Sequence, residues 1–234
     1  MYNARMPAKR TPVSRFGLQP PQLPKPVFAD ALPGVTLADH AEYSGLVLAG
    51  CSLADQAAQK VCFDQALLKR VNFGRTRLPG LQASDMRLEA CDLSGAQWEK
   101  ARLRRVELVG CRLVGAKLLD ATFEDVLLDH CEADLALFWS ASFKVARFER
   151  CRLREASFLK AQLPGVVFRD CDLSHADLRE ARLAGADFRR SVIDGLQVSL
   201  PDLRGVIIDP TQATAVAALA GLILRDDDEP PAPA

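Results

Sequence analysis

The cysteines are the residues of this chain with the widest range of chemistry, because thiolates bind metals, act as nucleophiles and form disulfides. Seven of the 234 residues are cysteine. Five of them stand twenty residues apart, and Cys51 continues the series two intervals earlier: Cys91, Cys111, Cys131, Cys151 and Cys171. Equal spacing places such residues in one column of a repeat structure. The column is either a ladder of metal-binding or disulfide-bonded thiols, or a packing position that requires a small side chain.

The surroundings of the cysteines favour packing. No Cys-x-x-Cys pair and no histidine series accompanies them, as a zinc site would require. Alanine occupies the equivalent position elsewhere in the repeat, and a free buried cysteine behaves as a small apolar residue. Cys62 is the exception, because its position in the repeat points outward. We therefore predict free thiols and no metal.

Other catalytic signals are weak. The three histidines, His40, His130 and His175, all occupy outward positions, and the chain contains no Gly-x-Ser-x-Gly, phosphate-binding glycine loop or zinc-protease helix. We predict neither an enzyme nor a bound cofactor. Thirty basic residues balance thirty acidic ones, so the net charge does not indicate a nucleic acid or a membrane. The absence of a signal peptide and of a long apolar run predicts a cytoplasmic protein.

The element that positions these residues is a repeat of five within the repeat of twenty. Residue 43 and every fifth residue to 208 is apolar, mostly Leu or Phe, and the residue two places before it is usually small. A period of five is neither helical nor that of an ordinary strand. It indicates that the backbone turns a corner at each repeat and that four corners close one coil. Where the central residue shrinks to Ala83, the preceding inward residue grows to Leu81, as a close-packed column requires.

The pattern resembles the pentapeptide-repeat family, whose consensus is Ala-(Asp/Asn)-Leu-x-x. The matching segments include Cys91-Asp92-Leu93, Cys171-Asp172-Leu173, Ala176-Asp177-Leu178 and Ala186-Asp187-Phe188. The resemblance implies an all-β fold, a right-handed quadrilateral parallel β-helix with about eight coils of twenty residues. Residues 28–209 form this unit with its N-terminal cap.

The two ends of the chain have other compositions. Residues 1–27 hold six prolines and five basic residues without an acid, which predicts a basic arm that is disordered or loosely docked. Asp209, Pro210 and Gln212 form a capping-box pattern at the start of a short helix over about 210–220 within a C-terminal cap, residues 210–224. The acidic residues 225–234 form a disordered tail. The candidates for closing the rod or forming a homodimer are Val216, Leu219, Ala220, Leu222 and Ile223.

Two outward columns of the rod are distinctive. One alternates in charge through Asp92, Arg112, Glu132, Arg152 and Asp172, which predicts a ladder that holds the coils in register. The other carries Leu119, Trp139 and Leu159, with Leu137 beside the tryptophan. We call these four residues the tryptophan patch and predict a binding site for a protein partner. The alternative is that an N-terminal segment of the chain covers them.

Two functions from different classes remain. The first is a protein-binding scaffold that uses the outer faces of the rod, with no direct nucleic-acid or membrane binding. The second is implied by the family resemblance: some members mimic B-form DNA, bind DNA gyrase or topoisomerase IV and protect against quinolones or similar poisons. A DNA mimic is acidic along its length. Here the acids gather in one coil, where we predict an acidic patch at Asp120, Glu124, Asp125, Asp129, Glu132 and Asp134. A gyrase supercoiling assay distinguishes the two functions.

Overall fold

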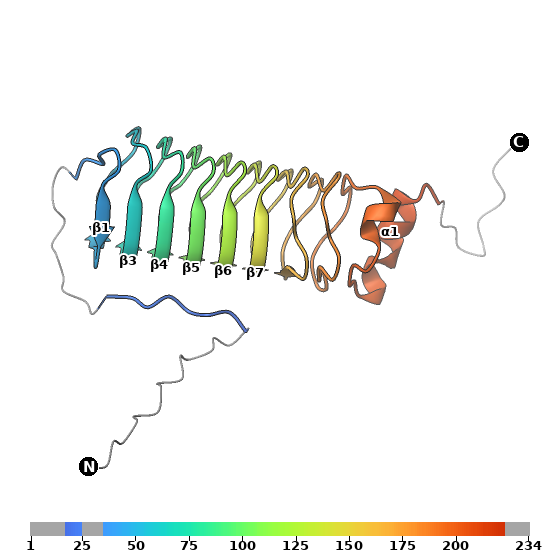
Figure 1. The fold of residues 1–234 in the computed structure, drawn as a ribbon. Helices are drawn as coiled ribbons and strands as arrows, with labels where there is room; N and C mark the ends of the chain where they lie inside the picture. Colours follow the sequence, from blue (N-terminus) through green and yellow to red (C-terminus); the bar gives the residue numbers. More distant parts are fainter. Residues whose placement is uncertain (1–16, 25–34, 223–234) are drawn as a thin grey trace, which may run out of the picture.

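Four-sided coils stacked into a rod make up most of the molecule (Figure 1). The computed structural model describes residues 17–24 and 35–222. Parallel pairs join residues twenty apart, from Glu42 with Cys62 in the first coil to Asp187 with Ile207 near the C-terminal end. Hydrogen-bonded strands lie about 4.8 Å apart, which sets the rise of each coil. The predicted parallel β-solenoid with twenty-residue coils is therefore confirmed.

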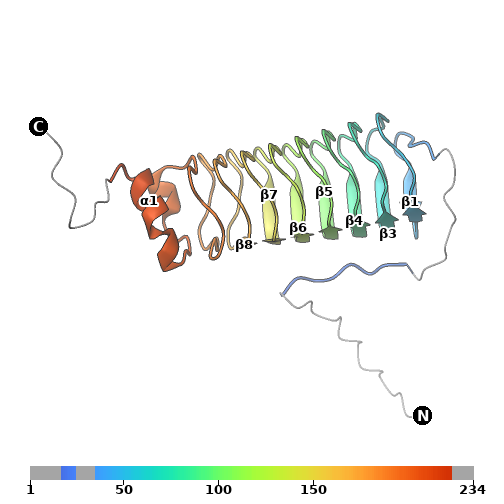
Figure 2. The ribbon, with the colours of Figure 1, turned by 180° about the vertical axis from the view of Figure 1, so that it is seen from behind.

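Two sides of each central coil form one long strand, and the other two sides are held by isolated bridges such as Asp92 with Arg112. Figure 2 shows the strands from behind. The order in the sheet is β1-β3-β4-β5-β6-β7-β8, with β2 also paired to β3. The elements are β1 (Glu42–Ser44), β2 (Val47–Ala49), β3 (Cys62–Lys69), β4 (Gln82–Glu89), β5 (Arg102–Val109), β6 (Thr122–Asp129), β7 (Ser142–Glu149), β8 (Val167–Arg169), the 3-10 helices η1 (Leu200–Leu203) and η2 (Pro210–Gln212), and the helix α1 (Ala213–Leu219).

The corners are made by residues in the left-handed backbone conformation. Every fifth residue from His40 to Gly205 has a positive φ, except Leu200, where η1 begins. Most of these residues are not glycine, although a side chain in this region costs about 1 kcal/mol or more. The hydrogen bonds between coils and the buried centres on either side hold each corner in place.

Replacing a corner alanine by glycine is therefore expected to stabilise the rod. Ala90 has a φ of +51° and an exposed side chain, so Ala90→Gly removes backbone strain and is expected to raise the free energy of unfolding by about 0.5–1 kcal/mol. Ala218→Gly is the matched control in α1, where the same change lowers the free energy of unfolding by about 0.5–1 kcal/mol. Urea denaturation measures both, and effects of the same sign would contradict the assignment of Ala90 to a strained corner.

The interior follows the five-residue repeat. Every central residue from Leu48 to Ile193 is at most 4% exposed, and the end positions Tyr43, Val198, Leu203 and Ile208 are half-buried. The compensating pair Leu81 and Ala83 is buried as predicted. The central residues form one continuous core along the rod axis.

The C-terminal end is closed largely as predicted. Asp209 accepts a hydrogen bond from the Thr211 N–H at 3.1 Å, and the Gln212 Oε1 accepts one from the Asp209 N–H at 2.9 Å. The first turn is a 3-10 helix, so the α-helix itself starts later than expected. The buried Gln212 side chain also donates to the carbonyl oxygens of Phe188 and Ser191, at 2.7 and 2.5 Å. A single amide thus satisfies main-chain groups that the end of the rod would otherwise leave unpaired.

The residues that close this end differ in part from those predicted. Val216 and Leu219 pack against the core, together with Ala215. Ala220 and Leu222 do not, since both are exposed, Leu222 at 62%. Ala220 follows the last residue of α1. Ile223 and the acidic tail lie outside the described residues.

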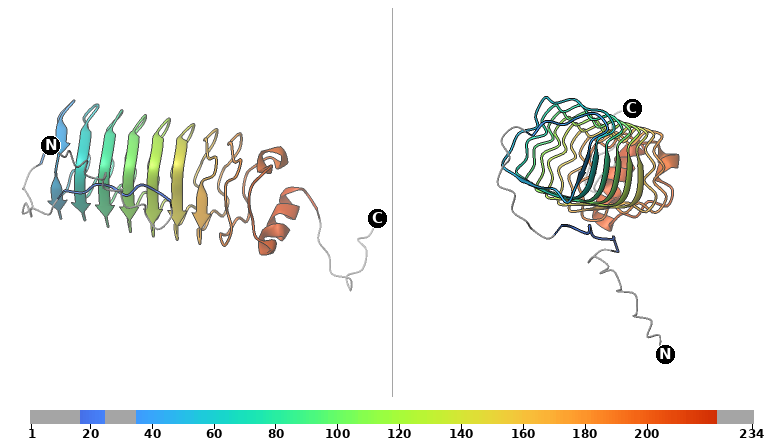
Figure 3. Two further views of the ribbon diagram at one scale, coloured as in Figure 1. Left: turned by 60° about the horizontal axis from the view of Figure 1, so that its bottom comes forward. Right: turned by 60° about the vertical axis from the view of Figure 1, so that its left-hand side comes forward.

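Part of the N-terminal arm lies against the rod. Residues 17–24 run extended along the outside of the rod (Figure 3). The rest of the arm, residues 1–16 and 25–27, lies outside the described residues. At the first coil, the Gln56 side chain accepts a hydrogen bond from the Leu37 N–H at 2.7 Å and donates one to the Val35 carbonyl at 2.9 Å. Residues 35–40 therefore cap the first coil, as predicted.

Candidate interaction surface

The cysteine column is a packing feature. Cys91, Cys111, Cys131, Cys151 and Cys171 are free and buried, as the packing interpretation predicts, whereas Cys51 is half-buried. Each Sγ in the series of five contacts the carbonyl oxygen 23 residues earlier, for example Leu68 for Cys91, at 3.4 Å. Because of the neighbouring thiol and of burial, the pKa of Cys171 lies well above the ordinary thiol range. Such a thiol is a poor nucleophile and a poor metal ligand at neutral pH.

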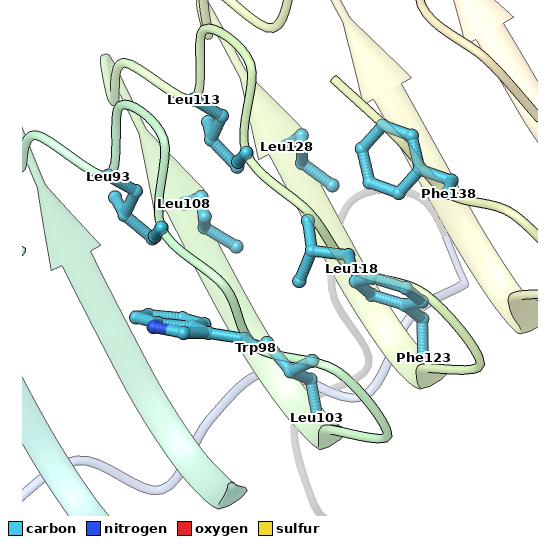
Figure 4. A pocket seen from close by; sticks show the side chains of 11 residues that line it. Leu93, Trp98, Leu103, Leu108, Leu113, Leu118, Phe123, Leu128 and Phe138 are labelled. Atoms are coloured by element: carbon cyan, nitrogen blue, oxygen red, sulfur yellow. The ribbon is translucent and has the colours of Figure 1, made fainter. Parts of the chain in front are cut away.

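One small cavity in the described part of the rod interior offers no room for a ligand. This cavity lies between the coils of Trp98 and Phe138, where Leu118, in the same column, fills less space than the aromatic rings on either side (Figure 4). Its volume is about 10 Å³ and all of its lining is apolar. A space of that size and polarity holds no more than one water molecule and is expected to stay empty.

The tryptophan patch lies on one side of the rod, with its residues in adjacent coils. The Asp120 N–H bonds the Trp139 carbonyl at 2.9 Å, and the Ser140 N–H bonds the Leu159 carbonyl at 2.9 Å, so the three coils stack directly. Trp139 is 42% exposed, while Leu119, Leu137 and Leu159 are half-buried. The patch extends to Leu135, which is 51% exposed at the neighbouring corner. The sequence analysis did not find Leu135, because it searched for apolar residues repeated along a column. The corner column of Leu135 otherwise carries only glycine and polar residues.

The indole of Trp139 is held in place. Its Nε1–H donates to the Ser157 Oγ at 2.7 Å, and that hydroxyl donates to the Asp177 Oδ2 at 3.4 Å. Asp177 is also bound by Arg179 at 2.8 Å. The hydrogen bonds from Arg179 lower the pKa of Asp177 despite partial burial, so the carboxylate stays ionised. The ring therefore presents its apolar face in a preset orientation, which reduces the entropy lost on binding.

The six acids do not form a patch, contrary to the sequence interpretation. They lie within one turn of the chain, but that turn has four corners, so the acids are spread over several sides, and only Glu132 and Asp134 share one side away from the corners. Glu124 and Asp129 are on the two halves of β6, whereas Glu132 is on the next side, between Arg112 and Arg152. Several are also neutralised, because Arg150 binds Asp129 at 2.5 Å and Arg152 binds Asp134.

The alternating charge ladder is in register, although its contacts are partly diagonal. Backbone bridges connect each member to the next, from Asp92 to Asp172. Arg152 lies 3.6 Å from Glu132, but its shorter contact is with Asp134, while Asp172 is bound by Arg154 rather than by Arg152. Arg152 thus reaches toward a carboxylate nearer the corner, and Arg154, which is itself nearer the corner, reaches back to Asp172 in the ladder. The ladder remains a structural feature that links successive coils.

A shallow polar depression lies on another side of the rod, across β3 to β6. It has a volume of about 270 Å³ and is open to solvent. Arg102, Arg104, Thr122 and Glu124 line it, together with Cys62, Gln82 and Ser84. Burial raises the pKa of Cys62, so this thiol is not an activated nucleophile. The depression lacks the pairing of nucleophile and base that covalent catalysis requires.

Comparison with known families agrees with the geometry. A family model described as "Pentapeptide repeat region" matches residues 141–215, and one described as "Pentapeptide repeats (8 copies)" matches residues 84–120. The match over residues 84–120 lies within the four-cornered coils, and the match over residues 141–215 runs from the coils into the C-terminal cap. The chain is a pentapeptide-repeat protein. No curated protein matches it significantly.

Several solved pentapeptide-repeat structures are similar in part. HetL, involved in heterocyst differentiation regulation in the cyanobacterium Nostoc sp. strain PCC 7120, is 23% identical, with 73% of this chain and 90% of HetL covered and a TM-score of 0.36. A trypsin-treated form of QnrB1, a plasmid-mediated fluoroquinolone resistance protein, is 19% identical, with 78% and 99% covered and a TM-score of 0.39. At these values neither likeness assigns a function to this pentapeptide-repeat protein.

No helix among the described residues is long and apolar enough to cross a membrane.

The repeats supply a rod whose distinctive features are on its outside: a preset tryptophan patch, an ion-paired ladder and a shallow depression. Of these, the tryptophan patch has the composition of a protein-binding surface.

Proposed function

We propose that this pentapeptide-repeat protein is a non-enzymatic scaffold that binds a protein partner through the tryptophan patch. The observation that carries the proposal is the exposed Trp139 with its indole N–H bonded to Ser157. Tryptophan is enriched among the residues that dominate binding energies, particularly when its position is fixed before binding.

The surroundings of Trp139 support this use. Leu119, Leu137 and Leu159 provide apolar contact area along three coils, and Leu135 extends it. The described part of the N-terminal segment does not cover the patch, since its hydrogen bonds are to the corner residues Asp85 and Asp125. The stacked coils also offer a regular, rigid surface, which suits the recognition of a folded partner.

Substituting Trp139 is expected to abolish partner binding while the rod stays folded. Removing a central tryptophan typically costs about 2 kcal/mol or more, which corresponds to roughly a 30-fold loss of affinity. The measurement is affinity capture with the full chain, followed by titration of each captured protein against wild type and Trp139→Ala. Val192→Ala is the matched control, because Val192 is an exposed apolar residue in a different column. Equal affinity of wild type and Trp139→Ala for every captured protein would refute the proposed site.

The gyrase-binding alternative has less support in the structure. A mimic of DNA requires rows of acids along one side. Here the acids circle one coil, and most outward columns mix both signs. The test is DNA supercoiling by gyrase, with and without a fluoroquinolone. A scaffold with another partner has no effect at micromolar concentration, whereas inhibition of gyrase or protection from the drug would favour the alternative.

A further inference from the structure

The described N-terminal segment, residues 17–24, is bound to the rod by its own backbone; we call it the strap. The Gln22 N–H donates to the Asp85 Oδ1 at 2.8 Å, and the Gln19 N–H donates to the Asp125 Oδ1 at 3.2 Å. Leu18 is only 5% exposed, although it does not belong to the main core. The other side chains of the strap are exposed or half-buried. The strap is therefore held by two main-chain donors and one apolar side chain.

The rod contributes a row of corner residues, which we call the corner ridge: Asp85, Arg105 and Asp125. They lie at the middle of β4, β5 and β6, with φ values of +52°, +51° and +54°. Arg105 binds Asp85 in a fork, with its Nε donating to the Asp85 Oδ1 at 2.7 Å. Both side chains of this pair are largely buried, so the carboxylate that accepts the Gln22 N–H is held rigidly. Burial alone would raise the pKa of Asp85, but Arg105 and the Gln22 N–H lower it, so Asp85 is ionised at neutral pH.

The composition of the strap favours the polyproline II conformation. Pro20, Pro21 and Pro24 have φ restricted to about −65°, and the residues before them are biased toward extended backbone. A polyproline II helix repeats every three residues, with a rise of about 9.3 Å per turn. Two coils of the rod span about 9.6 Å. Donors three residues apart on the strap therefore match carboxylates two coils apart on the ridge.

From this match, we infer that the corner ridge is a binding site for proline-rich peptides in the polyproline II conformation, and that the strap is its intramolecular ligand. The ridge recognises free backbone N–H groups at positions i and i+3, together with a leucine just before the first of them. Because the donors belong to the backbone, a peptide from another chain with the same spacing satisfies the site equally well. The strap, tethered to the same chain, occupies the site at a high effective concentration.

The first test removes only the two donors. In the variant Gln19→Pro/Gln22→Pro, each new proline keeps the polyproline II backbone but lacks an N–H. The control Gln19→Ala/Gln22→Ala removes both side chains and keeps both donors. Cleavage by chymotrypsin after Phe16 reports release of the strap, because the protease must bind Gly17 and Leu18 in its active site. We expect cleavage at least tenfold faster in the proline variant than in wild type or in the alanine control.

The second test asks whether the vacated ridge binds a peptide from outside. A fluorescein-labelled peptide with the sequence of residues 15–26 is titrated against the full-length proline variant and against wild type, by fluorescence polarisation. We expect binding to the proline variant at least tenfold tighter than to wild type, in which the strap competes. Asp125→Asn, added to the proline variant, is expected to weaken peptide binding about tenfold, since it removes one of the two charged acceptors. None of these variants changes a residue of the main hydrophobic core.

Three results would overturn the inference. One is chymotrypsin cleavage at the same rate in the proline variant and in wild type, because it would show that the donors do not hold the strap. Another is a labelled peptide that binds neither chain, or both equally. The last is equal binding by a peptide with proline at positions 19 and 22, since the ridge would then not recognise the backbone N–H groups.

Discussion

Duplicating the forty residues Cys111–Arg150 is expected to give a folded rod that is longer by two coils, about 10 Å. The coil length is twenty throughout the paired region, and each coil contacts mainly its neighbours, so whole coils can be added. Forty residues, rather than twenty, preserve the alternation of charge, because Glu132 of the added copy again precedes Arg152. We expect one cooperative unfolding transition with a free energy of unfolding at least equal to that of wild type.

A copy that lacks its last residue, Arg150, is the control. It contains 39 residues, so the coils after it are shifted by one position relative to those before it. A one-residue slip moves inward side chains outward, and the misplacement of even one buried Leu or Phe costs about 3 kcal/mol or more. Small-angle X-ray scattering measures the length, and urea denaturation measures the stability. If the two insertions unfold with the same midpoint, the twenty-residue coil does not determine the stacking.

Truncating Phe148 to alanine is expected to lower the free energy of unfolding by about 3–5 kcal/mol. The Phe148 ring stacks on Phe168 with centroids 4.8 Å apart. It also meets Phe138, Phe143 and Phe158 at 5.8–6.4 Å. Phe148 is fully buried, and no neighbouring side chain can fill the space without breaking its own column.

The control for this substitution is Phe148→Leu. Leu128 occupies the equivalent position one coil earlier, so leucine fits the backbone there, and the loss is expected to be only about 1–1.5 kcal/mol. Urea denaturation of the three proteins gives the comparison. A loss for Phe148→Ala no greater than for Phe148→Leu would show that the aromatic stack contributes little to stability.

Much of the fold could be predicted because a solenoid is nearly one-dimensional. The inward position of Cys91 or Leu118 depends only on its place in the five-residue repeat, and the neighbours of each residue are twenty positions away. The same argument located the tryptophan patch, because Leu119, Trp139 and Leu159 occupy one column. It failed for the six acids, since the repeat had to be followed around four corners to see that Glu124 and Glu132 face different sides.

Features outside the repeat were beyond this kind of prediction. From its composition the strap belongs to an arm that is disordered or loosely docked, because its proline content and lack of periodicity carry no information on what it touches. Its partner Asp85 is 63 residues from Gln22, and the match depends on the rise of the coils rather than on any motif. One signal of a special corner was present in the sequence. Asp85, Arg105 and Asp125 occupy one corner column and alternate in charge, as the predicted ladder does on another side of the rod.

The amino-acid pattern alone therefore determines the coil, the core and the column to which each outward residue belongs, because local repeats specify them without reference to distant residues. The orientation of the Trp139 indole depends on Ser157, and the docking of the strap depends on the distance between two carboxylates. Both are relations in space between groups that no repeat connects, so they emerge only when the coils are stacked.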